Sequence, residues 1–378
     1  MKLAKFVIGV LFLAVLASNI LAISRWSESR GVYDDVCYLR QAHLFQRFGL
    51  AGFDTDISKD DDRYLVGKLR DIGFAQWNDP RMAPCHVLME RSQKHVLQYP
   101  PGTGAVLALF PAGFQVIPMY VGANLIVFAF ALLALFRASS PPSATLVAIF
   151  GLGGLYLMIN PTKASYSIAP TMIVCVVAGF LSARLFASTA SRERLLLAAA
   201  IGILIGLSAT FRLPNVFLSA GYGTFFLVAF LLARSKQTFA EGFAFGAAFL
   251  IGIAPTLASN WINAGNPFTT TYGSIDAVPP AIDIEVLRSY LVDLQFFLLL
   301  AAIAWTAAIW RRPGCGQVVL VVAANLVVNI VFFMTHPVFT PYYTVPIAML
   351  SLWTLLFASL MPREAVADNP AVAQPASA

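Results

Sequence analysis

Long apolar runs alternate with short polar connections along most of this chain. A first apolar stretch covers Met1 to Ile23, and one long polar segment follows at residues 24–100. The later apolar runs lie at residues 102–117, 118–136, 144–160, 168–187, 195–213, 214–233, 239–259, 291–310, 317–335 and 341–361. A helix of about 20 apolar residues can cross the hydrocarbon core of a bilayer. The pattern therefore predicts an all-α, polytopic integral membrane protein.

The N-terminal stretch carries Lys2 and Lys5 ahead of its apolar run. A cleaved signal peptide would have this charge pattern, with an apolar core of about 7–15 residues. The run here is about eighteen residues long, enough to span a bilayer, and no small-x-small cleavage site follows it. We expect an uncleaved first span, with Arg25 outside the cytoplasm.

The run at residues 102–117 decides the predicted topology. If it crossed the membrane, every basic cluster in the later loops would lie outside. If it instead lies in the interface or re-enters, all of them fall on the cytoplasmic side with the N-terminus. Cytoplasmic loops are enriched in Lys and Arg, which favours the second arrangement. The clusters are Arg137; Arg184, Arg192 and Arg194; Arg234 and Lys236; Arg311 and Arg312; and Arg363.

This arrangement predicts about ten membrane-spanning helices with both termini in the cytoplasm. Residues 1–361 would form a single transmembrane domain. Its long first extracytoplasmic loop, 24–117, would contain juxtamembrane helices and a re-entrant or interfacial segment. The tail at 362–378 is rich in Ala and Pro and is expected to be a disordered cytoplasmic tail.

The composition agrees with a membrane protein. Of the 378 residues, 58% are hydrophobic and 12% are charged, whereas soluble domains average about 25% charged residues. The net charge of +6 is spread over short loops, so no nucleic-acid partner is expected. Cys37 and Cys85 share the long loop and either pair in an oxidising compartment or remain free thiols. A short basic N-terminus without an organelle signal favours a bacterial inner membrane.

Two adjacent carboxylates, Asp34 and Asp35, follow the first span by about ten residues. Beyond them, Tyr38 and later apolar residues recur at helical spacing, which predicts an interfacial amphipathic helix. An Asp at this point is a favoured helix cap. Two acids at the interface, followed by Tyr38, also suggest a functional site. At the end of the loop, Tyr99 to Gly102 (Tyr-Pro-Pro-Gly) forms a rigid corner, because paired prolines fix the backbone.

These segments resemble motifs of the GT-C superfamily of membrane glycosyltransferases. Residues 34–38 (Asp-Asp-Val-Cys-Tyr) are similar to the acidic motif in the first outer loop of that superfamily, with Asp35 where Glu is commoner. The closest branch comprises enzymes like the protein mannosyltransferases and aminoarabinose transferases, which use polyprenyl-phosphate sugars. The Tyr-Pro-Pro-Gly corner resembles a segment that follows their juxtamembrane helices.

Three later segments extend the resemblance over residues 6–361 in matching order. Residues 210–214 (Thr-Phe-Arg-Leu-Pro) are similar to an Arg-x-Pro helix end of the family. Residues 265–268 (Gly-Asn-Pro-Phe), with Tyr272, resemble a Gly-Asn-Pro segment of a later outer loop. Residues 340–346 (Thr-Pro-Tyr-Tyr-Thr-Val-Pro) are similar to the start of a C-terminal helix. In this last segment Thr340 or Pro341 stands near the usual position of an Arg.

The resemblance implies an inverting glycosyltransferase of the cell envelope. It would move a sugar from a polyprenyl-phosphate-linked donor to a hydroxyl of a lipid, glycan or protein acceptor at the extracytoplasmic face. Asp34 would be the general base, and Asp35 would orient the acceptor or a metal. Arg212 and Lys163, at outer ends of spans, would stabilise the leaving phosphate. Further substrate-binding candidates are Tyr38, Tyr99, His336, Tyr342 and Tyr343.

A metal requirement is left open by the sequence. His86 and His95 could join Asp34 in a divalent metal site, but no short ligand spacing supports one, and hydrogen-bonded histidines are the simpler interpretation. The acidic residues at 54–62 could bind a cation through oxygen ligands. A solvated acidic turn explains them equally simply.

Two other functional classes compete with an enzyme. A transporter or flippase for a lipid-linked sugar or small solute would place polar residues at mid-membrane, often in related halves. Here polar residues gather at outer helix ends, and no internal repeat is evident. Asn124, Asn325 and Asn329 are exceptions, which interhelical hydrogen bonds would explain. A membrane scaffold without catalysis would have no need of Asp34.

Overall fold

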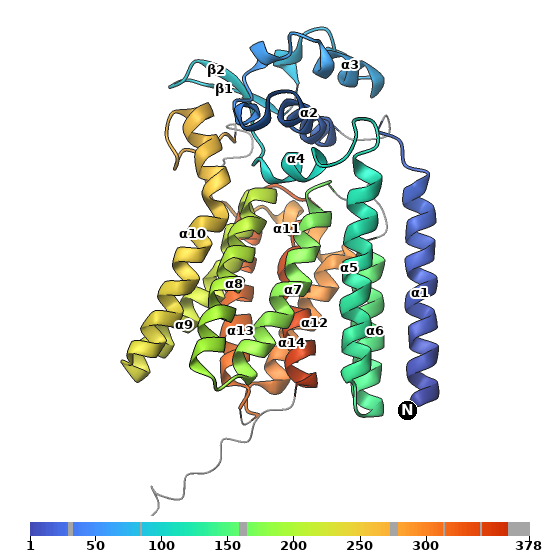
Figure 1. Ribbon diagram of the computed structural model, residues 1–378, viewed down its shortest axis with the longest axis vertical. Helices are drawn as coiled ribbons and strands as arrows, with labels where there is room; N and C mark the ends of the chain where they lie inside the picture. The colour runs from blue at the N-terminus through green and yellow to red at the C-terminus, as the bar shows by residue number, and fades with distance from the viewer. Residues whose placement is uncertain are drawn as a thin grey trace, which may run out of the picture.

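A computed structural model describes residues 1–28, 33–83, 85–158, 165–272, 279–312, 314–340 and 342–361, with only the backbone at residues 33, 34, 80 and 294. Long helices run side by side in a bundle, and a smaller cap of short elements covers one end of it (Figure 1). The N-terminus lies at the opposite end of the bundle.

Seven segments are long and apolar enough to cross a bilayer within the described residues. This finding agrees with the predicted all-α membrane protein. The segments are α1 (Lys2–Ser24), α5 (Val116–Arg137), α7 (Ile168–Ala187), α8 (Ser191–Phe211), η5 (Leu213–Ser219) continued by α9 (Ala220–Ala233), α10 (Lys236–Ala264) and α13 (Gly316–Thr335).

The other apolar helices are shorter or bent. Helices α6 (Pro141–Leu157) and α14 (Val345–Leu360) each have fewer than 18 residues. Helices α11 (Ile284–Leu291) and α12 (Leu294–Ile309) meet at a bend of 79°. Only together are they long enough to cross a bilayer. These helices coincide with three more of the apolar runs in the sequence, while the number of membrane spans stays a prediction.

The apolar run at residues 102–117 does not form a spanning helix. Its helical residues are α4 (Gly102–Leu107), six residues long, and the first two residues of α5. At 1.5 Å per residue, α4 extends about 9 Å, far less than the roughly 30 Å of a hydrocarbon core. The interpretation in which this run crosses the membrane is therefore excluded by its length.

The cap comes from the long polar segment. It contains α2 (Tyr33–Phe48), α3 (Tyr64–Asp71) and the antiparallel strands β1 (His86–Met89) and β2 (Lys94–Leu97), in which His86 pairs with Leu97. The short 3-10 helices η2 (Gly49–Phe53), η3 (Ile57–Lys59) and η4 (Pro80–Met82) connect them. The helix predicted after the acidic pair is α2. It begins at Tyr33, so both acids lie in its first turn, where the helix dipole favours negative charge.

Small residues bring α8 and α10 into close contact. A Cβ atom added to Gly206 of α8 would lie 2.3 Å from the carbonyl oxygen of Phe249 and 2.9 Å from the Cα atom of Gly252. Only glycine fits at such a distance, and small residues are typical of helix interfaces in membranes. This contact holds α8 against α10 about two turns before Arg212, which follows the end of α8 nearest the cap.

Buried asparagines join helices through hydrogen bonds. Asn19 of α1 donates to the Asn124 side chain of α5 at 2.9 Å and to the carbonyl of Leu155 in α6 at 2.8 Å. In α13, Asn325 accepts from the Gly221 backbone at 2.7 Å, and Asn329 donates to the Phe217 carbonyl at 3.1 Å. The three asparagines singled out in the sequence thus have the interhelical role expected of them.

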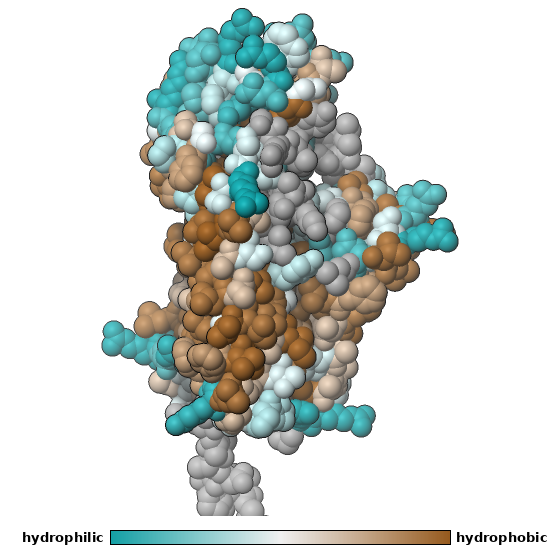
Figure 2. Space-filling model, turned by 90° about the vertical axis from the view of Figure 1, so that its right-hand side faces the viewer, coloured by the Kyte–Doolittle hydropathy of each residue, from teal (hydrophilic) through white to brown (hydrophobic). Residues whose placement is uncertain are grey.

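The connections that carry basic residues between α5 and α6, α7 and α8, and α9 and α10 lie at the end opposite the cap (Figure 1). Lys5 near the N-terminus donates to the Phe136 carbonyl at that end. There Arg194 forms two 2.9 Å hydrogen bonds to the buried carboxylate of Glu241. On the face shown in Figure 2, hydrophobic residues cover much of the bundle between this end and the hydrophilic cap.

Candidate functional site

The carboxylate of Asp35 is buried where α2 meets the bundle. Its side chain belongs to a residue that is 1% exposed, and its Oδ1 accepts a hydrogen bond of 3.2 Å from the backbone N–H of Tyr166. Tyr166 lies just ahead of α7, outside the membrane-spanning helices. Burial, and secondly the negative charge of Asp35, raise the pKa of the Tyr166 phenol, so the phenol remains neutral. Asp35 therefore places a carboxylate inside the protein.

Arg212 supplies a buried cation at the end of α8 nearest the cap. The residue is 7% exposed, and its guanidinium lies 4.8 Å from the ring centre of Tyr342 and 5.2 Å from that of Tyr343. Its Nη1 donates to the Tyr342 carbonyl at 3.3 Å. Among the described residues, no carboxylate forms an ion pair with it. A buried cation held by aromatic rings without an acidic partner is suited to bind an anion.

The start of α14 lies beside this cation. Thr344 is the N-cap residue of α14, and its buried hydroxyl has no hydrogen-bond partner among the described residues. A helix N-terminus favours negative charge because its first backbone N–H groups are unpaired. The ring of His336 lies 6.3 Å from that of Tyr343 and stacks on Phe332. The predicted residues Tyr342 and Tyr343 therefore lie against Arg212, and the predicted residue His336 lies beside Tyr343.

Tyr120 of α5 connects the carboxylate with the cation. It is 2% exposed, and it lies close enough to Asp35, Tyr38, Tyr166 and Tyr342 for their charges to act on its phenol. Tyr342 in turn accepts the hydrogen bond from Arg212. The predicted acid, the predicted cation and several predicted tyrosines thus border one buried region between bundle and cap.

The Tyr-Pro-Pro-Gly corner packs between α2 and α8. Tyr99 stacks on Tyr38 with ring centres 5.0 Å apart. A Cβ atom on Gly102 would lie 2.3 Å from Oγ1 of Thr210, so only glycine allows the corner to approach α8 this closely. Thr103 donates from its hydroxyl to the Phe211 carbonyl at 3.3 Å. The corner therefore holds α2 against the helix end that carries Arg212.

The Gly-Asn-Pro segment approaches the same corner. Gly265 ends α10 with φ of 73°, in the left-handed region that favours glycine. Farther along the chain, Thr271 donates from its hydroxyl to the Gln98 carbonyl at 3.0 Å. The ring of Tyr272 meets that of Tyr99 edge-on at 6.1 Å. All five segments that carry the family resemblance therefore contribute described residues near the junction between bundle and cap.

Some predicted site residues lie outside what the structure describes. The side chain of Asp34 is not among the described ones, although its backbone belongs to the first turn of α2. Lys163 and Pro341 also lie outside the described residues. The proposed roles of Asp34 as a base and of Lys163 as a phosphate ligand stay predictions.

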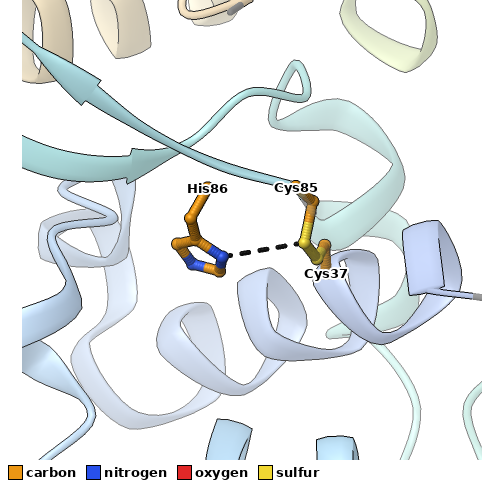
Figure 3. A group of neighbouring side chains, drawn as sticks. All are labelled: Cys37, Cys85 and His86. Carbon is orange, nitrogen blue, oxygen red and sulfur yellow. Dashed lines mark hydrogen bonds between the residues drawn. A yellow bond between two sulfur atoms is a disulfide. The ribbon is translucent and has the colours of Figure 1, made fainter. Parts of the chain in front are cut away.

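Cys37 of α2 and Cys85, just before β1, form a disulfide (Figure 3). This resolves the alternative that the sequence left open. His86 lies beside the sulfurs, with Nδ1 3.7 Å from Sγ of Cys85. Its Nε2 lies 2.8 Å from Nη1 of Arg40. Because a guanidinium only donates, Nε2 is the acceptor and Nδ1 carries the proton.

These three residues have the donor atoms of a metal site, all within 4.8 Å of one another. However, the disulfide removes both thiolates, and the protonated Nδ1 of His86 has no lone pair for a metal. The pKa of His86 is lowered by burial, and secondly by the charge of Arg40. The arrangement thus fits a structural disulfide better than a metal centre. No described group of three ligands contains His95.

Ion pairs occupy the acidic turn of the cap. Asp61 pairs with Arg47, Asp62 lies 2.7 Å from Nε2 of His43, and Asp54 lies 3.1 Å from Nζ of Lys94. These basic partners make the turn a paired surface rather than a cluster of free oxygen ligands.

Several residues at the junction between bundle and cap were not predicted as site residues from the sequence. Tyr120 and Tyr166 lie in or beside apolar runs, where a tyrosine resembles one of the aromatic belt. Gln41 is buried in α2, and neither atom of its amide has a hydrogen-bond partner. It comes one turn after Cys37, on the face of α2 that carries Tyr38, so helical periodicity from Tyr38 could have identified it.

Comparison of this chain with known protein families, proteins and structures identified no related protein. No protein-family model matches the chain, and no curated protein or solved structure shows significant similarity to it.

Proposed function

We propose that this protein is an inverting glycosyltransferase of the GT-C superfamily. It transfers a sugar from a polyprenyl-phosphate-linked donor to the hydroxyl group of a lipid, glycan or protein acceptor. The reaction takes place at the extracytoplasmic membrane face. In this proposal about ten helices span a bacterial inner membrane, and both termini are cytoplasmic.

One observation carries the proposal. A buried carboxylate, Asp35, and a buried cation without an acidic partner, Arg212, lie on two sides of the same tyrosine cluster. Group transfer from a phosphate leaving group needs a base on the attacking side and a positive charge on the leaving side. The position at the end of an apolar bundle suits a donor whose lipid chain remains in the membrane.

The proposed reaction is a single displacement. The acceptor oxygen attacks the anomeric carbon, and its bond to that carbon forms as the bond from carbon to phosphate oxygen breaks. The proton of the acceptor passes to a carboxylate in the first turn of α2, with Asp34 as the proposed base and Asp35 as the orienting group. Polyprenyl phosphate leaves with the electron pair. Arg212 and the N-terminus of α14 stabilise its negative charge.

The tyrosines would hold the donor beside these charged groups. Tyr342 and Tyr343 orient the guanidinium of Arg212. Tyr38 and Tyr99 form a stacked aromatic wall on the side of the cap. Aromatic rings suit the apolar face of a sugar, and their hydroxyl groups suit its polar edge.

The test uses purified protein in lipid vesicles with a panel of radiolabelled polyprenyl-phosphate sugars. Wild type is compared with Asp34→Asn and Asp35→Asn, and Asp71→Asn on the exposed end of α3 serves as a matched control. Transfer of label to an acceptor or to water, lost in the first two variants and kept in the third, supports the proposal. Uptake of a solute into sealed vesicles without donor binding would overturn it in favour of a transporter.

A further inference from the structure

We infer that Trp26 and Tyr166 are positioning residues for Asp35. The inference rests on the proposed function, since it assigns these residues to the carboxylate end of the proposed site. Trp26 after α1 and Asp35 in the first turn of α2 are nine positions apart, and here they meet Tyr166, which lies before α7 and more than 130 positions later in the sequence.

Two hydrogen bonds in series connect Trp26 with Asp35 through Tyr166. Nε1–H of Trp26 donates to the hydroxyl oxygen of Tyr166 at 3.3 Å, and the backbone N–H of Tyr166 donates to Oδ1 of Asp35 at 3.2 Å. The rings of Trp26 and Tyr166 also meet edge-on, with centres 6.4 Å apart. The hydrogen bond that reaches the carboxylate comes from the backbone, so it depends on where that backbone is held.

A second anchor holds the same backbone from the other side. The hydroxyl of Tyr120 donates to the carbonyl of Ser165 at 3.4 Å, and its ring packs edge-on against Tyr166 at 6.5 Å. Tyr166 is fully buried, so water cannot replace a lost partner easily. Trp26 therefore fixes the side chain of Tyr166, while Tyr120 fixes the peptide just before it.

This geometry assigns a function to two residues outside the family motifs. A carboxylate that orients a reacting group must be held to within roughly 0.5 Å, and groups around the first ones usually provide that precision. Loss of the Trp26 bond would release the Tyr166 side chain without removing its ring. The backbone N–H would then drift from Asp35, and the chemical step would slow while donor binding at Arg212 would not change.

The kinetic test compares Tyr166→Phe, Trp26→Phe and the double variant in the vesicle assay. Tyr156→Phe, a half-exposed tyrosine of α6, is the matched control. We expect each single variant to lower kcat about tenfold to a hundredfold with an unchanged KM for the donor. The double variant should be no slower than either single one, because both changes remove the same bond. Wild-type kcat in the single variants, or a raised KM with normal kcat, would overturn the inference.

A measurement without turnover separates this inference from the proposed function. An apolar carbodiimide reacts with accessible buried carboxyl groups, and peptide fragmentation in a mass spectrometer distinguishes Asp35 from Asp34. At one fixed pH, Asp35 should be labelled several-fold faster in Tyr166→Phe and in Trp26→Phe than in Tyr156→Phe. Equal labelling in all three overturns the positioning role even if the protein transfers sugar. Faster labelling in an inactive protein would support the contacts and reject the enzyme.

Discussion

The ring of Tyr38 stacks on the ring of Tyr99, with centres 5.0 Å apart and planes inclined by 24°. These residues belong to α2 and to the Tyr-Pro-Pro-Gly corner, which are 61 positions apart in the sequence. The stack therefore joins the segment that carries the acidic pair to the segment that packs on α8. It is a non-covalent link between both sides of the candidate site.

We predict that this stack matters through its aromatic area. Tyr99→Phe retains the ring and should keep sugar transfer within about twofold of wild type, whereas Tyr99→Leu should lower it about fivefold, as expected for an aromatic pair worth roughly 1 kcal/mol. Initial rates in vesicles provide the measurement. Equal rates for Phe and Leu would show that the ring is not needed.

Arg212 should contribute mainly to donor binding. Arg212→Gln removes the only described charge at the anion side, so we expect the Kd for a polyprenyl-phosphate sugar to rise at least about tenfold. Arg212→Lys should recover part of this loss, because an ammonium keeps the charge without the planar fork. Equilibrium binding with labelled donor measures both.

A matched control for this prediction exists at the other end of the bundle. Arg137 also lies over an aromatic ring, 5.3 Å from the centre of Phe180. Arg137→Gln should leave the donor Kd unchanged. If it weakens binding as much as Arg212→Gln does, the effect is one of overall charge and not of a site.

The Cys37–Cys85 disulfide should stabilise the cap. It closes a loop between residues 48 positions apart and ties α2 to the β-hairpin. Removal of such a bond costs about 2–5 kcal/mol in small extracellular domains. We expect Cys37→Ser and Cys85→Ser to make the cap more sensitive to limited proteolysis, while Cys315→Ser does not. A free thiol at Cys37 in oxidised wild-type protein would contradict the prediction.

Much of the architecture followed from hydrophobic patterning because membrane-spanning helices are long and apolar. The helix after the acidic pair was also predictable, since Tyr38 and its neighbours repeat at helical spacing. The β-hairpin was not, because β1 and β2 have only four residues each and carry the polar residues His86, Lys94 and His95. Short elements like these depend on neighbours that are distant in sequence.

The candidate site was predictable where a residue type is costly in its surroundings. Arg212 stands out at the end of an apolar run, because burial of a lone cation is unfavourable. Tyr166 does not stand out, since its role depends on a backbone N–H that every residue has. The fit of Gly102 against Thr210 likewise appears only when α4 and α8 meet.

His86 should make the cap less stable in acid. Burial and the positive charge of Arg40 hold the pKa of its imidazole below the value of about 6.5 expected in the unfolded chain. The unfolded state therefore binds a proton that the folded state does not, and stability falls as the pH drops below 6.5. We therefore expect the free energy of unfolding to fall between pH 6.5 and 5.

Thermal unfolding in detergent at several pH values tests this effect. In His86→Gln the amide oxygen can still accept from Arg40 but does not titrate, so this part of the pH dependence should disappear. The prediction fails if His86→Gln and wild type lose the same stability between pH 6.5 and 5.

The ion pair of Arg194 and Glu241 should stabilise the fold without taking part in the reaction. Glu241 is 2% exposed and receives both hydrogen bonds from the guanidinium. Glu241→Gln leaves the charge of Arg194 without its partner, which costs about 3 kcal/mol for a buried pair. In the exposed pair of Arg184 and Glu193, Glu193→Gln should cost less than about 1 kcal/mol. Thermal unfolding compares the stability of the two variants. Donor binding by Glu241→Gln at low temperature should remain normal, because this pair lies at the end of the bundle opposite the cap. Loss of donor binding in a folded Glu241→Gln protein would show instead that the two ends are coupled.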